Sequence, residues 1–244
     1  DSPGILNPME RAQFARLNLV AGKYSVRTSS YEQARGYFLA GISLLHADHW
    51  EKQYSLALEL YECSVHVCFM DGNVENSSSR LDAILANAKT FEDSLNARAM
   101  FAKLLVAQER YAEGMKSIIE LLSSLGEVFP SEVDASLAKS EIETTMPLLK
   151  DVSKERILGL PPMTDRSKLS AMKFLGLLIH FANFYSPLLV HLVSCRMIQI
   201  IFKHGYCEDA IEALVTFAHG MLSADSFCPR TPISDLYSPI PIKR

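Results

Sequence analysis

The chain has 244 residues, of which 48% are apolar and 21% charged, with 11 Gly and 11 Pro. This composition predicts an ordered core and excludes a disordered or collagen-like chain. The formal net charge of -4 gives no electrostatic basis for binding nucleic acid or an anionic membrane surface.

Cysteine usage and the N-terminal residues bear on where the protein works. The five cysteines show neither the short paired spacings of a zinc site nor those of a small disulfide scaffold, so we expect reduced thiols at Cys63, Cys68, Cys195, Cys207 and Cys228. No secretory signal pattern is present, and we expect a cytoplasmic location. Because the chain begins at Asp1 and not at Met, we expect a fragment or processed product of a longer polypeptide.

Helical periodicity begins close to the N-terminus. Asn7-Pro8 predicts the cap and first turn of a helix that continues to Val26. Its apolar residues at helical spacing are Phe14, Leu17, Ala21 and Tyr24. Ser29-Ser30 predicts the cap of a second helix over residues 31–45, and the two helices should form an antiparallel pair.

Two further helix pairs follow. Residues 50–70 predict one helix, Asp71-Gly72-Asn73 a turn, and a second helix runs to Lys89. Residues 90–108 and 111–124 predict a third pair. In that pair we expect Phe101, Leu104 and Leu105 to face Met115, Ile118, Ile119 and Leu122.

The pattern changes after Pro130. Residues 133–146 predict a more polar helix that Pro147 kinks or ends, and Leu160-Pro161-Pro162 predicts a rigid break. Asp165 should cap the next helix, and Glu208 begins the last one. The predicted organisation is therefore N-terminal repeats (1–128), a spacer (129–164), C-terminal helical pairs (165–224) and an extended tail (225–244).

The 22 residues from Phe174 to Cys195 contain no Lys, Arg, Asp or Glu. This uncharged stretch is long enough for a membrane span. Ser186-Pro187 divides this stretch as a helix cap and first-turn proline would. A buried helical hairpin is therefore the favoured interpretation. The polar residues that also oppose a span are His180, Asn183 and His191.

Small residues recur at the spacing of tetratricopeptide repeats, in which paired helices approach closely at small side chains. Two copies fit well, and they comprise Gly22, Ala34, Phe38 and Gly41, then Ala102, Gly114, Ile118 and Leu121. A weaker copy comprises Val65, Ser77, Leu81 and Ile84, and another comprises Ile198, Ala210, Leu214 and Phe217. The expected fold is all-α, with antiparallel helix pairs stacked as a tetratricopeptide-like right-handed solenoid of degenerate repeats.

The sequence resembles the helical repeat region that follows the STAND-type AAA ATPase domain in large multidomain sensor histidine or serine/threonine kinases. The residues that carry this resemblance are Asn7 to Arg11, Leu17 to Gly22, Tyr31 to Leu45, Tyr54 to Gly72, and Leu160 to Asp165. The resemblance implies a link between a nucleotide-driven switch and sensor or kinase domains in one cytoplasmic polypeptide. The chain itself lacks the ATPase, sensor and kinase domains of that family.

Motifs for catalysis and cofactor binding are missing from the sequence. It has no phosphate-binding loop, dinucleotide fingerprint, kinase motif, nucleophile elbow or HExxH zinc motif. His46, Asp48 and His49 carry metal-binding atoms but lie at a helix junction, where capping or solvent exposure is more common. The helical directions of Cys63, His66 and Cys68 diverge, which disfavours a shared metal. We expect no catalytic residue, metal or cofactor in this chain.

Two further features leave other roles open. Trp50, Tyr54 and Tyr61 could line a peptide groove, although their spacing favours helix packing. Thr231-Pro232 and Ser238-Pro239 are minimal proline-directed phosphorylation sites in the tail.

The leading functional hypothesis is a non-catalytic interaction and regulatory module of a larger ATPase/kinase-type signalling protein, whose partners are protein domains of the same polypeptide. The alternative is a free-standing adaptor that binds a peptide or protein. A small metal-dependent or hydrolytic enzyme ranks third.

Overall fold

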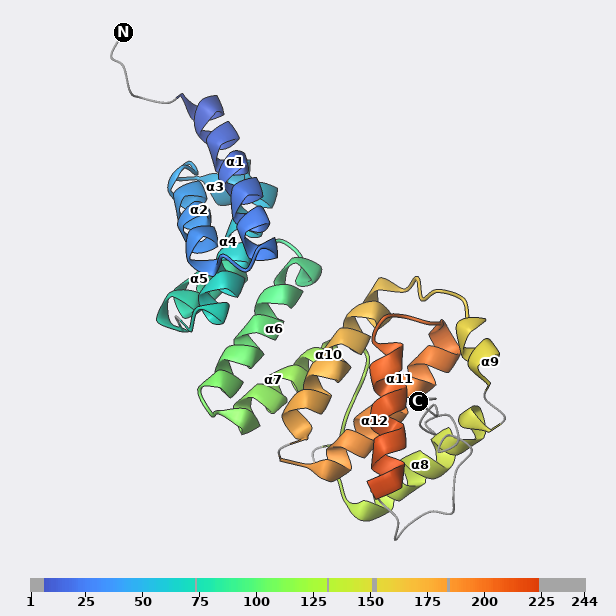
Figure 1. Ribbon diagram of the computed structural model, residues 1–244. Coiled ribbons are helices and arrows are strands. Elements are labelled where there is room, and N and C mark those ends of the chain that lie inside the picture. The colour runs from blue at the N-terminus through green and yellow to red at the C-terminus, as the bar shows by residue number, and fades with distance from the viewer. Residues whose placement is uncertain (1–6, 73, 131, 151–152, 184, 224–244) are drawn as a thin grey trace, which may run out of the picture. The chain divides into compact units, whose positions relative to one another are not determined.

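A computed structural model describes residues 7–72, 74–130, 132–150, 153–183 and 185–223 (Figure 1). Within these ranges the chain forms helices and no strand, with one isolated backbone bridge between Pro162 and Tyr206. The all-α prediction is therefore confirmed. The helices are α1 (Pro8–Arg27), α2 (Tyr31–Ser43), α3 (His49–Lys52), α4 (Tyr54–Met70), α5 (Val74–Asn87), α6 (Phe91–Ala107), α7 (Tyr111–Ser124), α8 (Ala135–Leu149), α9 (Lys154–Leu158), α10 (Arg166–Ala182), α11 (Pro187–His204) and α12 (Ala210–Ser223). Asn73 and the predicted tail, with Cys228, Thr231 and Ser238, lie outside the described residues.

The chain divides into two compact units, residues 1–110 and 111–244. The first unit contains α1 to α6, and the second contains α7 to α12. The repeat pattern groups α7 with the N-terminal repeats up to residue 128, whereas α7 packs against α10 inside the second unit. Phe101 of α6, which was expected to face α7, is 41% exposed.

Helix α1 begins at a complete capping box. The Asn7 side-chain oxygen accepts hydrogen bonds from the backbone N–H groups of Met9 and Glu10, at 3.0 and 2.9 Å. The Glu10 carboxylate in turn accepts a 2.9 Å bond from the Asn7 N–H. Pro8 occupies the first helical position, where its missing N–H costs nothing. The predicted start of this helix is confirmed.

The side of α1 that faces the core is not the one with the bulkiest residues. Its buried residues are Ala15, Leu19, Gly22 and Ser25. Of the residues at helical spacing that predict this helix, Phe14, Leu17 and Tyr24 are 45%, 62% and 68% exposed. Small side chains allow two helix axes to approach closely, so α1 packs on α2 by its small face and leaves the bulky one outside.

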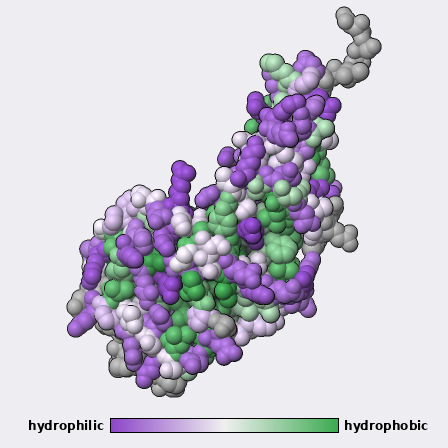
Figure 2. All heavy atoms as spheres, turned by 180° about the vertical axis from the view of Figure 1, so that it is seen from behind, coloured by the Kyte–Doolittle hydropathy of each residue, from purple (hydrophilic) through white to green (hydrophobic). Residues whose placement is uncertain are grey.

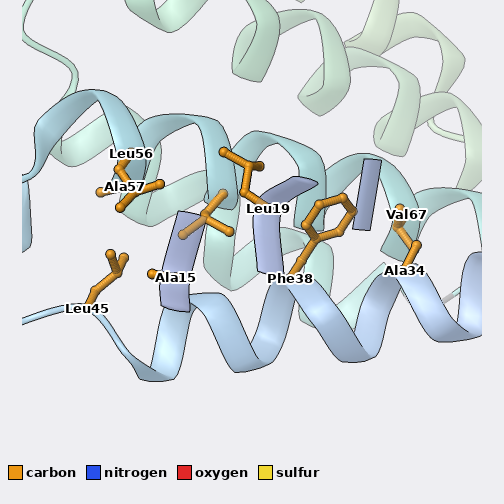
Figure 3. Close-up of a cluster of buried hydrophobic side chains, with 9 residues drawn as sticks. Ala15, Leu19, Ala34, Phe38, Leu45, Leu56, Ala57 and Val67 are labelled. Atoms are coloured by element: carbon orange, nitrogen blue, oxygen red, sulfur yellow. The ribbon is translucent and has the colours of Figure 1, made fainter. Parts of the chain in front are cut away.

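The core of the first unit has two parts. One lies between α1, α2 and α4, where the Phe38 ring packs among aliphatic side chains (Figure 3). Its buried members are Ala15, Leu19, Ala34, Phe38, Leu45, Leu56, Ala57, Leu60 and Val67. The other lies between α4, α5 and α6 and contains Val65, Leu81, Ile84, Ala97 and Leu104. Helix α4 contributes to both parts and is the central helix of this unit.

The helix expected over residues 50–70 is interrupted near its start. Gln53 has φ −128° and ψ 31°, which separates the single turn of α3 from α4. Trp50 lies on α3 and packs against both parts of the core. The broken backbone places the indole beside Tyr61 of α4, with ring centroids 5.0 Å apart.

The second unit is built around α11, which packs against α8, α10 and α12. Asp165 caps α10 by accepting hydrogen bonds from the N–H groups of Ser167 and Lys168, at 2.9 and 3.2 Å. Ser186-Pro187 begins α11, so the uncharged stretch from Phe174 to Cys195 forms the predicted buried hairpin. None of the described helices combines the length and hydropathy that a membrane crossing would need.

The segment predicted as a spacer contributes to this unit's core. Helix α8 continues through Pro147 and ends two residues later at Leu149. Pro147 has no N–H to donate to the Glu143 carbonyl, so the helix loses one hydrogen bond of its last turn. It buries Ala138, Thr145 and Leu149 against its neighbours. The amide of Gln199 on α11 donates 3.0 Å hydrogen bonds to Thr145 Oγ1 and to Glu141 Oε2. These bonds satisfy the polar groups that the α8–α11 contact buries.

Candidate functional site

A pocket of about 290 Å³ opens in the first unit where α4, α5 and α6 meet. Its apolar lining comes from all three helices and consists of Val65, Leu81, Ile84, Ala97, Ala99 and Met100. Its polar lining comes from α4 and α6 and consists of Glu62, Cys63, His66, Asn96 and Lys103. Apolar walls with a few polar groups are typical of a binding site.

The ends of α4 and α6 are tied together beside this pocket. Thr90 caps α6 by accepting a 3.1 Å hydrogen bond from the Asp93 N–H. The Tyr54 hydroxyl at the start of α4 donates to Asp93 Oδ2 at 2.7 Å and accepts from the Lys89 N–H at 2.8 Å. The Lys89 ammonium lies 4.4 Å from the centre of the Tyr54 ring. Tyr54 therefore positions the start of α6 against the start of α4.

Polar side chains connect α4 with α1 and with α6 at similar separations along the chain. The Lys23 ammonium on α1 pairs with the Glu59 carboxylate on α4, 36 residues later. The Asn96 amide on α6 donates a 3.1 Å hydrogen bond to Glu62 Oε1 on α4, across 34 residues. Helices α1, α4 and α6 therefore have their solvent-facing polar side chains in register. The usual tetratricopeptide period is 34 residues.

Burial changes the protonation equilibria of the pocket's titratable groups. It raises the pKa of the Glu62 carboxyl, an effect that the hydrogen bond from Asn96 partly offsets. It raises the pKa of the Cys63 thiol to about 11. Desolvation by the pocket wall, followed by the nearby Lys103 cation, lowers the pKa of His66. At neutral pH Cys63 is a thiol and His66 is a neutral imidazole.

This chemistry suits binding better than catalysis. A thiol whose pKa is raised by burial is a weak nucleophile, because the reactive species is the thiolate. The lining offers hydrogen-bond donors and acceptors at the rim and dispersion contacts inside. Its volume is at the lower limit for a drug-sized ligand and is enough for one or two side chains of a peptide.

The metal-binding candidates from the sequence do not converge. His46 Nδ1 contacts the Asp48 carboxylate, which also pairs with Lys52, and the Lys52 contact is the larger cause that lowers the pKa of Asp48. His49 Nδ1 lies 2.7 Å from the His46 carbonyl oxygen. In the described ranges, no three His, Cys, Asp or Glu side chains form a group that could hold a metal ion.

The second set, Cys63, His66 and Cys68, is likewise spread over α4. Cys68 is fully buried and accepts a 3.2 Å contact from Arg80 Nη1, whereas His66 is exposed at the pocket. Cys63 lines the pocket beside His66.

The aromatic residues Trp50 and Tyr61 pack inward. Both are partly buried against the two parts of the core, and the His49 ring stacks on Tyr61 at a centroid distance of 5.8 Å. Neither lines the pocket, and Tyr54 acts at the helix junction described above. None of the three aromatic side chains therefore forms part of the pocket lining.

Most residues at the repeat positions are buried. Leu214 alone among them is half-buried, and the buried ones are Gly22, Ala34, Phe38, Gly41, Ala102, Gly114, Ile118, Leu121 and Ala210. Two glycines lie at close helix contacts. A methyl group on Gly22 would come within 2.4 Å of the Phe38 ring, and one on Gly41 within 2.7 Å of Leu60 Cδ2.

Helical periodicity in the sequence does not single out the polar pocket residues Glu62, Asn96 and Lys103. They lie on the outward faces of their helices, where periodicity gives no signal. Aligning α4 with α6 at a 34-residue offset places Glu62 opposite Asn96, and that comparison would have singled them out.

Comparisons with protein-family models, with curated proteins and with solved structures give no match for the chain.

Proposed function

We propose that this chain is a non-catalytic helical-repeat module that binds protein segments through the α4–α5–α6 pocket and regulates a larger cytoplasmic ATPase/kinase-type signalling protein. The observation that carries the proposal is the pocket itself. It joins an apolar interior to a polar rim where α4, α5 and α6 meet. Stacked helical pairs use such surfaces to hold extended or helical peptides.

The repeat interpretation is supported by contact geometry as well as by residue spacing. The ion pair between Lys23 and Glu59 connects α1 with α4, and the hydrogen bond between Asn96 and Glu62 connects α6 with α4. Their separations of 36 and 34 residues lie close to one tetratricopeptide period.

The regulatory part of the proposal follows from how binding energy acts. A neighbouring domain that contacts the pocket in only one of its states shifts its own equilibrium towards that state. The ATPase and kinase context comes from the family resemblance of the sequence. The partner domain would then be part of the same polypeptide and present at a high effective concentration.

Photo-crosslinking in the source cells tests the proposal. A benzophenone amino acid at Ala99 would line the pocket, and the same amino acid at Ala107 would serve as the matched control on the exposed end of α6. We expect Ala99 to give a discrete crosslink to an ATPase or kinase domain of the same polypeptide. The benzophenone at the control position Ala107 should not give this crosslink.

Other crosslinking outcomes would support a different function or contradict the proposal. A specific crosslink from Ala99 to a separate protein would replace the intramolecular role with that of a free-standing adaptor. Identical products from Ala99 and Ala107 would show that the pocket selects no partner, and the proposal would be wrong.

A further inference from the structure

Helix α1 carries an apolar stripe that no described residue covers. At 100° per residue, Met9, Leu17, Val20 and Tyr24 fall within an arc of about 80°. Their side chains are 72%, 62%, 65% and 68% exposed. Figure 2 shows hydrophobic surface interspersed with hydrophilic surface on one face of the protein. Single exposed apolar residues are normal, but four aligned on one helix mark an interaction surface.

The opposite face of α1, which packs against the core, supports the interpretation of the stripe as an interaction surface. That face is narrow and consists largely of small residues, with Ala15, Gly22 and Ser25 buried. A helix with one partner buries its bulky apolar residues and exposes the others. Helix α1 does the reverse, which is the pattern expected when a second partner covers the bulky face.

Charge around the stripe identifies the chemistry of that partner. Arg16 and Lys23 lie along one edge of the stripe, and Arg27 lies at its C-terminal end, whereas Glu10 is the acidic residue of the other edge. Lys23 pairs with Glu59 of α4. Arg16 and Arg27 are exposed and pair with no side chain in the part of the chain that the structure describes. Two cations beside an apolar seam favour a partner with carboxylates next to its own apolar residues.

A second copy of the chain fits this surface poorly. The stripe runs from Met9 to Tyr24, so its centre lies at Arg16 and Leu17. In an antiparallel two-fold contact each Arg16 would lie near its own symmetry mate, and like charges oppose that contact. A parallel contact would offer only Glu10 to the three basic side chains.

A lipid surface also fits less well than a helix. Gln13 lies within the stripe, where a protein partner can satisfy its amide with hydrogen bonds. An interfacial membrane helix combines its apolar face with an opposite face rich in basic residues. In α1 the opposite face is packed against α2.

We propose that the outer face of α1, formed by Met9, Leu17, Val20 and Tyr24 with Arg16 and Arg27, docks an amphipathic helix whose apolar stripe is flanked by Asp or Glu. This surface is separate from the α4–α5–α6 pocket, and it does not depend on what the pocket binds. Apolar side chains at i, i+3, i+4 and i+7 of the partner would fill the spaces between the four α1 residues. The arginines would set its orientation.

Two synthetic peptides test whether the surface prefers a helix with acidic flanking residues. They share one amphipathic apolar sequence, and one carries Glu while the other carries Lys at the flanking positions. Fluorescence anisotropy with the full 244-residue chain should show that the Glu peptide binds about tenfold or more tightly than the Lys peptide. Val20→Asp should weaken the Glu peptide by about tenfold. Ile211→Asp on α12, which replaces a β-branched residue with 60% exposure, is the matched control and should leave binding unchanged.

A charge variant keeps the test independent of folding defects. Arg16→Glu changes no buried group and should remove the preference for the Glu peptide. Equal binding of the two peptides, or equal binding by the Val20→Asp and parent chains, would overturn the proposal. Stripe-dependent dimerisation in gel filtration would assign the surface to a second copy. Stripe-dependent recruitment to phosphatidylserine-containing vesicles, without peptide binding, would assign it to lipid.

Discussion

Gly22 of α1 lies directly against the ring of Phe38 on α2. A methyl group built on Gly22 would come within 2.4 Å of Phe38 Cε1 and within 2.7 Å of two other ring carbons. Phe38 is fully buried in the core that α1, α2 and α4 share, so the ring has no free space to enter (Figure 3). This contact fixes the distance between the two helices of the first pair.

Gly22→Ala should therefore destabilise the protein although it improves helix propensity. We expect a net loss of up to about 2 kcal/mol in the free energy of unfolding, because overpacking costs about 1–3 kcal/mol and the propensity gain returns about 1 kcal/mol. Gly36→Ala on α2 is the matched control. No atom lies within 4 Å of its added methyl group, and it should stabilise the protein by up to about 1 kcal/mol. Urea titration measures both, and equal stabilities would show that the Gly22–Phe38 contact is looser than described.

Gly205, which follows α11, holds the segment after α9 against the loop before α12. It has φ +106°, and a methyl group there would lie 2.3 Å from the Pro161 carbonyl oxygen. The adjacent Tyr206 exchanges two 2.8 Å backbone hydrogen bonds with this segment, donating to the Pro161 oxygen and accepting from the Met163 N–H.

Gly205→Ala should break this bridge. We expect a loss of about 2–6 kcal/mol, since a steric clash of about 1–3 kcal/mol adds to a strain of about 1–3 kcal/mol for a side chain at φ +106° and ψ −178°. Hydrogen exchange at the Met163 and Tyr206 amides should accelerate in the variant. Gly72→Ala carries the strain without the clash, because its φ is +71° and no atom lies within 4 Å, so it should cost only about 1 kcal/mol. Unchanged protection of the two amides in Gly205→Ala would contradict the prediction.

Glu127 provides a buried ionic connection in the second unit. Its carboxylate accepts hydrogen bonds from Lys168 of α10 at 2.6 Å and from Arg196 of α11 at 3.0 Å, and the residue is 5% exposed. Glu127→Gln removes the negative charge that both cations contact and should lower the free energy of unfolding by about 2–4 kcal/mol. This loss is smaller than for a fully buried ion pair, because Lys168 and Arg196 remain partly hydrated. Glu120→Gln, which breaks an exposed contact of 3.9 Å with Lys116, should cost about 0.5 kcal/mol or less. Thermal unfolding of the two variants distinguishes these outcomes, and similar melting temperatures would mean that Glu127 is not shielded from water.

Cys63 reports on the pocket through its reactivity. Because burial raises the pKa of this thiol to about 11, roughly a hundredfold fewer thiolates exist near pH 8 than for a free cysteine. Alkylation by iodoacetamide, followed at the Cys63 peptide by mass spectrometry, should be slower by a similar factor than in urea-unfolded protein. The rate should rise about tenfold per pH unit from about pH 7 to 10. A partner in the pocket should slow it further. A rate that levels off near pH 9 would show that the thiol is less buried than the structure indicates.

Local sequence signals determined where many helices begin and end. Asn7-Pro8, Thr90 and Asp165 cap helices with the hydrogen bonds that their side-chain types favour, and Ser186-Pro187 divides the uncharged stretch into two helices. These features depend on contacts within about four residues of the chain. They can be predicted from sequence because no distant residue takes part in them.

Other features depended on residues far apart in the sequence. Periodicity identified α1 by Phe14, Leu17 and Tyr24, but the close approach to Phe38 selected the small face of the helix for burial. The break at Gln53 likewise accommodates Trp50 in a core that several helices share.

The sequence alone therefore established the all-α class, the caps of α1 and α10 and the absence of a recognisable catalytic motif. The tertiary structure decided which face of each helix is buried, and it brought Glu62, Asn96 and Lys103 to one pocket and Glu127, Lys168 and Arg196 to one buried cluster. The physical reason is that capping energies act within a single turn, whereas packing and the pairing of buried charges depend on the shapes and charges of side chains from distant parts of the chain.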